Sequence, residues 1–205
     1  MAASLSKHGI TAIGTKLDVA NAEEVEKVFE VARKEFGRID ILVNNAGIIR
    51  RASPEAYLEE DWDATLEIDL TATFILSQAC GRIMLNKNRC NIISVASILS
   101  FQGGLNVSAY TASKHGVAGL TKALANAWAG KGVNVNALAP SFFATELTEA
   151  LQKDPDRSRS ITMRTPAGRW GVPEDIAGAA VFLASPASDF INGVTLPVDG
   201  GWMAW

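Results

Sequence analysis

Strand-like apolar runs alternate with long helix-like segments along this chain, and that alternation restricts the fold more than any other feature. Ile39–Val43 is an almost continuous apolar run, as in a strand buried on both faces of a sheet. Asn91–Val95 and Val133–Leu138 are further strand-like runs, and the segments between the three, Asp61–Leu85 and Ser108–Ala129, have the period of helices. Strands separated by helices of this length predict βαβ units and a parallel sheet, hence an α/β fold.

Weaker signals at both ends of the chain extend the same pattern. Asn21 is predicted to cap a helix that ends at Gly37, and a proline in the first turn marks a helix over Pro173–Ala184. The other predicted segments are strands at Ile10–Val19 and Thr195–Val198 and a polar stretch around Lys153–Ser160. No internal repeat or low-complexity linker divides the chain, so residues 1–205 are interpreted as a single domain.

Composition argues against several classes of function. The 205 residues include 19 basic and 22 acidic side chains, a net charge of −3, without a basic stripe, so nucleic-acid binding is not expected. The sequence shows no leader pattern and no run of membrane-spanning length, which favours a cytoplasmic protein that does not bind membranes. Cys80 and Cys90 lack CxxC spacing and predict free thiols, and His8 and His115 are too far apart to indicate a metal site.

Three residues form a pattern that points to proton transfer. Tyr110 and Lys114 are four residues apart in a predicted helix and therefore share one face of it. A tyrosine is a poor base because its ordinary pKa is near 10, but a neighbouring cation favours the phenolate and lowers that pKa. Ser97 follows the predicted strand Asn91–Val95 at its carboxyl end, the edge where ligands bind in open α/β sheets. Ser97 is therefore expected to donate to the same substrate oxygen that Tyr110 protonates.

Several motifs together make the chain resemble the short-chain dehydrogenase/reductase family. They are Leu17-Asp18-Val19, Asn44-Asn45-Ala46-Gly47, Ser97, Tyr110 with Lys114, Pro140 with Thr145, and Val198-Asp199-Gly200-Gly201. Within that family the sequence is most similar to 2-deoxy-D-gluconate 3-dehydrogenases and related sugar-acid dehydrogenases. The stretches that carry this likeness are Ile49–Arg51, Ala96–Gly104, Pro166–Gly171 and Val198–Trp202. The resemblance implies a Rossmann-like, doubly wound parallel sheet and hydride transfer between NAD or NADP and a hydroxyl or keto group of a sugar acid or polyol.

The resemblance also implies a role for each matching residue. Tyr110 is the general acid/base, Lys114 lowers its pKa and holds the nicotinamide ribose, and Ser97 orients the carbonyl. On the cofactor side, Asp18 and Val19 are expected to flank the adenine, Asn44, Ala46 and Gly47 to line the adenosine side of the groove, and Thr145 to meet the nicotinamide end or the pyrophosphate. The two long helices are expected to form a subunit interface, giving a homotetramer or a homodimer.

Two adjacent arginines are candidates for binding the substrate's acid group. Arg50 and Arg51 follow the Asn44–Gly47 motif, and a planar guanidinium suits a carboxylate. The alternative, which the residues favour, is a solvated pair of charges on a loop.

Three departures from the family pattern stand beside these matches. Asp69 occupies a position where the family usually has an asparagine that holds a proton-relaying water, and this catalytic candidate is predicted to pair with Lys114 and weaken its effect on Tyr110. Ser141 stands where a glycine usually follows the proline, and its side chain is expected to crowd the cofactor.

The third departure is the glycine-rich phosphate-binding turn, whose spacing none of the 17 glycines has. We therefore expect an N-terminally truncated domain that lacks the first strand–helix–strand unit, with one edge of Ile39–Val43 exposed. The alternative is a non-catalytic homologue, or a fragment, that keeps the oligomer interface without productive cofactor binding.

Overall fold

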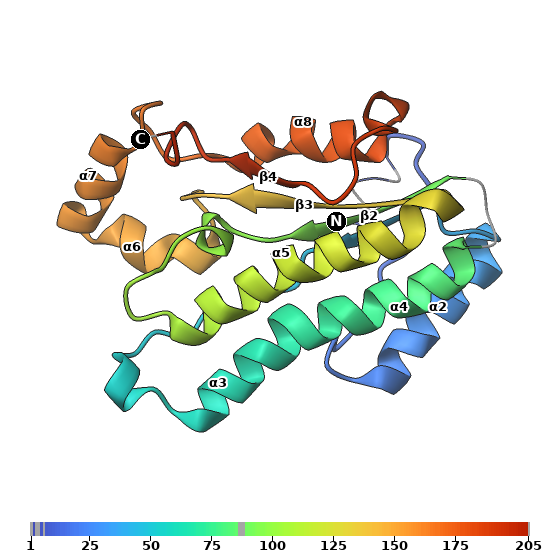
Figure 1. The fold of residues 1–205 in the computed structure, drawn as a ribbon, viewed down its shortest axis with the longest axis horizontal. Coiled ribbons are helices and arrows are strands. Elements are labelled where there is room, and N and C mark those ends of the chain that lie inside the picture. The colour runs from blue at the N-terminus through green and yellow to red at the C-terminus, as the bar shows by residue number, and fades with distance from the viewer. Residues whose placement is uncertain (1, 3–4, 6, 86–88, 205) are drawn as a thin grey trace.

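The sheet of this protein runs in chain order through four parallel strands. A computed structural model describes residues 2, 5, 7–85 and 89–204. In that part of the chain the strands are β1 (Ile41–Asn44), β2 (Cys90–Val95), β3 (Val133–Pro140) and β4 (Thr195–Val198), hydrogen-bonded in the order β1-β2-β3-β4. All carboxyl ends therefore meet at one edge of the sheet (Figure 1).

Helices cover both faces of this sheet (Figure 1). On one face lie α2 (Ala22–Phe36), α4 (Ala72–Met84) and α5 (Ser108–Trp128), and on the other lies α8 (Pro173–Ala184). Two short helices, α6 (Glu149–Lys153) and α7 (Pro155–Arg164), lie beyond the carboxyl ends of the strands. The remaining helical segments are α3 (Glu59–Leu66), which runs into α4, and single turns at Pro54–Ala56, Ile98–Ser100, Ala129–Lys131, Glu146–Thr148 and Pro186–Ser188.

The two faces of the central strands fill two separate cores. Ile92 of β2 packs with Met84, Val133 and Val135 under α4 and α5, whereas its neighbour Ile93 packs on the α8 side. Successive side chains of a strand point to opposite faces, so β2 is buried on both. The α/β fold with a Rossmann-like parallel sheet that the sequence predicts is therefore confirmed.

Helix α2 has the ends that its sequence predicts. The Oδ1 atom of Asn21 accepts hydrogen bonds from the N–H groups of Glu23 (3.0 Å) and Glu24 (3.2 Å), which satisfies two donors of the first turn. Gly37 follows the last turn with a φ of 72°, a left-handed conformation that favours glycine, and its N–H donates to the Arg33 carbonyl.

The predicted helix over Asp61–Leu85 is continuous but not uniform. A π-helical segment, Glu67–Thr71, joins α3 to α4. Asp69 is at its centre and is fully buried, with no exposed surface. Such segments are frequent at functional sites because they redirect one side chain out of the regular helical repeat.

Two predictions about the outer elements are wrong, and a third segment, left without an assigned secondary structure, is helical. Residues 10–19 form no strand, because they do not pair with the outer edge of β1, and Ile10 and Ile13 are exposed. Strand β1 is not buried on both faces: it lies at the edge of the sheet, with Ile41 45% and Val43 52% exposed. The polar stretch around Lys153–Ser160 is largely helical, because Asp154 caps α7 by accepting from two backbone N–H groups and Pro155 occupies its first turn.

Small residues let α4 and α5 pack closely against their neighbours. A Cβ on Gly81 of α4 would lie 2.8 Å from the Trp128 ring, and one on Gly116 of α5 would lie 2.7 Å from the Leu70 side chain. Cys80 and Cys90 are both buried and not joined in a disulfide, as predicted, and burial raises the pKa of Cys80 to about 12. No helix in the described part of the chain is long and apolar enough to cross a membrane.

Candidate active site

A cavity of about 840 Å³ opens where the carboxyl ends of the strands face α5, α6 and α7. Ser97, Tyr110 and Lys114, the three residues predicted to carry the chemistry, all line it, and so do Gly47 and Thr145. The described residues around this cavity include four cations, Arg51, Lys114, Arg157 and Arg164, and no aspartate or glutamate. An anionic ligand is therefore favoured over a cationic one.

Tyr110 and Ser97 are hydrogen-bonded neighbours in the lining of this cavity. Ser97 lies two residues after the end of β2, and its Oγ accepts the Leu99 N–H (3.1 Å), which holds the serine at the start of a short helical turn. A hydrogen bond from Ser97 lowers the pKa of Tyr110, but burial and then the charge of Asp69 outweigh it and raise that pKa to about 12. Tyr110 is therefore a protonated phenol at neutral pH, ready to act as an acid.

Lys114 is buried and tied to two partners. Its Nζ donates to the Val95 carbonyl (3.0 Å), pairs with the Oδ2 atom of Asp69 at 3.6 Å, and lies 5.3 Å from the centroid of the Tyr110 ring. Burial lowers the pKa of Lys114, and Asp69 opposes this shift. The predicted lowering of the Tyr110 pKa is therefore not found. Burial, which the sequence does not reveal, raises this pKa, and the charge of Asp69 raises it further and opposes the effect of Lys114.

Asp69 connects three elements around Lys114. Its Oδ1 accepts the Ile48 N–H (2.8 Å) in the loop after β1, and its Oδ2 accepts the Ser113 hydroxyl (3.3 Å) on α5 beside Lys114. Burial raises the pKa of Asp69, while Lys114 and the two hydrogen bonds lower it less. Gly47 completes this region: a Cβ there would lie 3.4 Å from Asp69 Oδ1 and 3.5 Å from Lys114 Nζ.

The residues predicted for the cofactor are only partly brought together. Gly47 and Thr145 line the cavity, and Asn45, which was not predicted, lines it beside them. Asn44 does not, because its Nδ2 donates to the Ser77 (3.0 Å) and Ser94 (3.2 Å) hydroxyls, and Ala46 is also not part of the lining.

Asp18 and Val19 lie apart from the cavity, at the start of α2. The Asp18 N–H donates to Glu24 (2.7 Å), and its Oδ1 accepts the Ala20 N–H (3.0 Å), so this residue shapes the turn before the helix. Their role at the adenine stays a prediction.

Ser141 lines the cavity with its hydroxyl directed to the protein. Its Oγ donates to the Asp199 carbonyl (3.3 Å), and its N–H donates to the Val198 carbonyl (3.2 Å), which joins the ends of β3 and β4. The hydroxyl is thereby engaged in a structural contact.

The structure separates the two adjacent arginines. The Nε of Arg50 pairs with Asp61 at 3.2 Å, so for Arg50 the alternative interpretation, a solvated charge on a loop, holds. Arg51 lines the cavity and lies in the electrostatic range of Tyr110. Sequence reasoning missed Arg157 and Arg164, which line the cavity from α7; their seven-residue spacing was the available signal.

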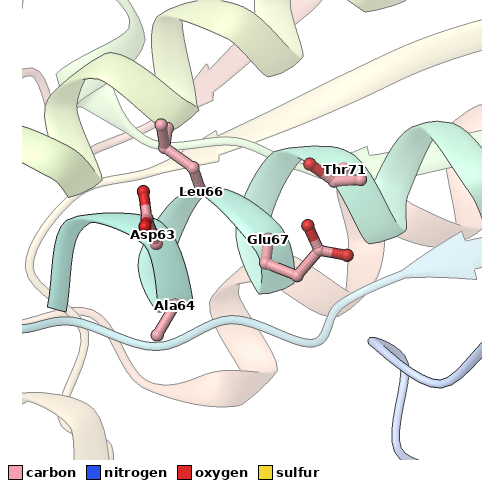
Figure 2. A pocket seen from close by; sticks show the side chains of 5 residues that line it. All are labelled: Asp63, Ala64, Leu66, Glu67 and Thr71. Carbon is pink, nitrogen blue, oxygen red and sulfur yellow. The ribbon is translucent and has the colours of Figure 1, made fainter. Parts of the chain in front are cut away.

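A second hollow lies on the outside of the long helix. It measures about 520 Å³ and is lined by Asp63, Ala64, Leu66, Glu67 and Thr71 (Figure 2). All five belong to the continuous α3–α4 helix, and none is among the predicted site residues. The larger cavity is therefore the candidate active site. Among the described residues no cluster of three or more His, Cys, Asp or Glu side chains is arranged to hold a metal ion.

Fold and site together define an α/β protein with a Ser–Tyr–Lys site at the carboxyl edge of a parallel sheet. Residues 1–203 match a family model described as enoyl-(acyl carrier protein) reductase. The chain therefore belongs to the short-chain dehydrogenase/reductase family and is an enzyme of the oxidoreductase class.

Relatives with high sequence identity are named for sugar acids. The 2-dehydro-3-deoxy-D-gluconate 5-dehydrogenase of Dickeya dadantii is 47% identical over 201 residues, 95% of this chain and 79% of the relative. The structure of a gluconate 5-dehydrogenase from Burkholderia cenocepacia, in complex with NADP and tartrate, is 41% identical with a TM-score of 0.96, covering 100% of this chain and 80% of that one. An Agrobacterium tumefaciens structure with bound NADP, provisionally named 2-deoxy-D-gluconate 3-dehydrogenase, is 48% identical with a TM-score of 0.88, covering 98% and 80%.

Proposed function

We propose that the protein is an NAD(P)-dependent dehydrogenase that interconverts a hydroxyl and a keto group of a sugar acid. The observation that carries this proposal is the position of Ser97, Tyr110 and Lys114 in one cavity whose charged side chains are all cations. The names of the relatives support a sugar acid as substrate and NADP as one of the cofactors. The 2-deoxy-D-gluconate 3-dehydrogenase likeness favours reaction at C3, whereas the names of most relatives favour C5.

The residues present fit the nicotinamide side of a dinucleotide. Gly47 leaves space beside the Nζ of Lys114 because it has no side chain, and Asn45 and Thr145 add polar groups to the same wall. The described residues that line the cavity include no carboxylate, which also suits a ligand that carries phosphates. When bound, the nicotinamide accepts hydride in oxidation and supplies it in reduction.

Proton transfer falls to Tyr110. In reduction the phenol gives its proton to the substrate carbonyl oxygen as hydride adds to the carbon; in oxidation the same oxygen takes the hydroxyl proton back. Ser97, which already hydrogen-bonds to Tyr110, holds the substrate oxygen in line. The buried amine of Lys114 lies on the ring of Tyr110 and is in place to hold the cofactor's ribose.

Arg51 is the residue that we assign to the substrate's carboxylate. It lines the cavity, and Tyr110 influences it electrostatically. A guanidinium binds a carboxylate through two parallel hydrogen bonds, which fixes orientation as well as charge. The site thus has a place for the acid group and a place for the reacting oxygen.

The deciding experiment measures formation and consumption of reduced nicotinamide with NAD and NADP on a panel of aldonates and ketoaldonates. Tyr110→Phe is expected to lower kcat by roughly a hundredfold to ten-thousandfold, the usual contribution of a general acid/base. Tryptophan fluorescence should still report NADPH binding by this variant, since the ring remains. Full activity of Tyr110→Phe would refute the assignment, and a wild-type chain with neither saturable cofactor binding nor turnover would favour a non-catalytic homologue.

We propose further that a homodimer or homotetramer forms through α4 and α5. Gly119 of α5 is exposed with no atom within 4 Å of an added Cβ, and Phe74 of α4 is 40% exposed, so each helix has a small or apolar residue at the surface, which supports this assembly. Light scattering on the purified chain measures the assembly state, and a monomeric mass would contradict this part of the proposal.

A further inference from the structure

One face of α7 forms part of the cavity wall. Arg157, Ser160, Ile161 and Arg164 line the cavity, and they follow the i, i+3, i+4, i+7 spacing of a single helical face. Ile161 is 3% exposed and packs with Ile98 and Trp202. This buried anchor fixes the rotation of α7, so the two arginines are held toward the cavity.

The two arginines on this face are not equivalent. The guanidinium of Arg164 lies 4.0 Å from the Trp202 ring centroid, a cation–π contact that orients it along the wall. The side chain of Arg157 is exposed at the cavity mouth, while its backbone N–H is capped by Asp154 Oδ1 at 3.0 Å. Arg157 stands in the first turn of α7, where a cation opposes the helix dipole. Its position is therefore not explained by the stability of the helix.

Arg157 and Arg51 share one region of the cavity. Partial burial and the charge of Arg157 both lower the pKa of Arg51, whereas Tyr110 acts on Arg51 in the opposite direction. Within the part of the chain that the structure describes, neither guanidinium forms an ion pair with a carboxylate. Two like charges that repel each other beside a catalytic tyrosine gain from any anion that enters between them.

We propose that Arg51 and Arg157 bind one carboxylate of the substrate between them, and that Arg157 makes the site selective for sugar acids over neutral polyols. This inference rests on the proposed function and adds to it the residue that sets the substrate class. A charge-assisted hydrogen bond to each guanidinium holds the acid group at the α7 side. The reacting hydroxyl then extends toward Ser97 and Tyr110, which line the same cavity.

The test compares Arg157→Gln, Arg157→Lys and the wild type on gluconate and on sorbitol, its neutral counterpart. Arg157→Gln is expected to raise KM for gluconate about tenfold to a hundredfold, with kcat and the sorbitol KM little changed. Arg157→Lys should recover part of the loss because the charge returns without the planar fork. Arg159→Gln is the matched control, because Arg159 is exposed on the same helix and does not line the cavity.

Structural damage and cofactor effects have separate signatures. Because Arg157 opposes the helix dipole, Arg157→Gln should leave the Tm unchanged or raise it. Higher salt should raise the wild-type KM for gluconate more than that of Arg157→Gln. Equal losses on gluconate and sorbitol, or a change in KM for NADPH alone, would overturn the carboxylate clamp.

A binding measurement keeps the clamp separate from the proposed function. Isothermal titration of gluconate into the wild-type chain and Arg157→Gln needs no turnover. Binding that depends on Arg157 in a chain without dehydrogenase activity would support the clamp and refute the function. Turnover of gluconate with no effect of Arg157→Gln would support the function and refute the clamp, and a chain that does not bind gluconate at all would also refute the clamp.

Discussion

Replacing Asp69 by asparagine is expected to make the fold more stable at neutral pH, although it removes one half of a buried ion pair. The substitution keeps the shape of the side chain and the acceptor for the Ile48 N–H. It removes a negative charge from a position with no exposed surface. It also restores the residue type that the short-chain dehydrogenase/reductase family usually has there.

Two opposing contributions decide whether Asp69→Asn raises or lowers the free energy of unfolding. The attraction between Asp69 and Lys114 at 3.6 Å is roughly 4 to 5 kcal/mol at an effective dielectric constant near 20. Moving each ion out of water costs several kcal/mol, and the raised pKa of Asp69 shows that its burial outweighs the attraction and the hydrogen bonds together. In the variant, Lys114 is not left as a fixed cation, because burial already lowers its pKa and its amine still donates to Val95.

Linkage gives the pH window. An acid whose pKa is raised by folding contributes stability that is fully present below its unfolded pKa, near 4, and is lost as the pH rises through the folded pKa. Above that window we expect Asp69→Asn to be more stable than the wild type, because the variant has no carboxylate to ionise in a buried position. Below about pH 4 the two proteins should have the same stability, because protonated aspartate and asparagine are both neutral.

Urea unfolding followed by tryptophan fluorescence at a series of pH values measures this difference. Glu149→Gln serves as the control, because it breaks an exposed carboxylate–lysine pair with Lys153 and should change stability by less than about 1 kcal/mol. A loss of roughly 3 to 5 kcal/mol in Asp69→Asn at neutral pH would refute the reasoning, since that is the cost of a stranded buried cation. The pH dependence of oxidation is a second readout: without Asp69 the pKa of Tyr110 falls, so its phenolate should support turnover at lower pH.

Two further predictions concern the packing and capping of the helices. Gly81→Ala should destabilise the fold by about 1 to 3 kcal/mol because its Cβ would meet the Trp128 ring, whereas Gly119→Ala, with no atom within 4 Å, should stabilise α5 by up to about 1 kcal/mol. Urea midpoints of the two variants test this pair, and equal shifts would contradict it. Asn21→Ala should cost about 1 kcal/mol by removing the acceptor for two N–H groups of α2, and an unchanged urea midpoint would show that the cap contributes nothing.

The features predicted correctly from the sequence depend on short-range chemistry. Asn21 caps a helix through N–H groups two and three residues ahead, and Tyr110 and Lys114 are neighbours because a helix places i and i+4 on one face. Ser97 lies in the same cavity because it follows a strand, and ligands of open α/β sheets bind at the carboxyl ends of the strands. In each case the relevant partner is near in sequence or set by the topology of a parallel sheet.

The features missed depend on partners that are distant in sequence. Arg50 and Arg51 have the same side chain, and only the position of Asp61 decides which of them is held away from the cavity. The apolar residues of β1 suggested burial on both faces, but its exposure follows from its place at the sheet edge, which the lack of a glycine-rich turn predicted and the strand's own residues did not. The shift of the Tyr110 pKa has the same origin, since it depends on how deeply the assembled fold buries the phenol and on Asp69, which comes from another helix.

The charges at the site therefore form two groups with different consequences. Near Tyr110 the cation of Lys114 is matched by Asp69, so the proton-transfer end carries little net charge. Arg51 and Arg157 also line the cavity, and the described lining residues include no carboxylate. On the proposed function, an anionic substrate is drawn to these two arginines by its acid group, which leaves its hydroxyl for proton exchange with Tyr110. We therefore expect different charged groups in one cavity to orient the substrate and to exchange its proton. Asp69 balances the charge of Lys114, so that Lys114 does not compete with the two arginines for the acid group.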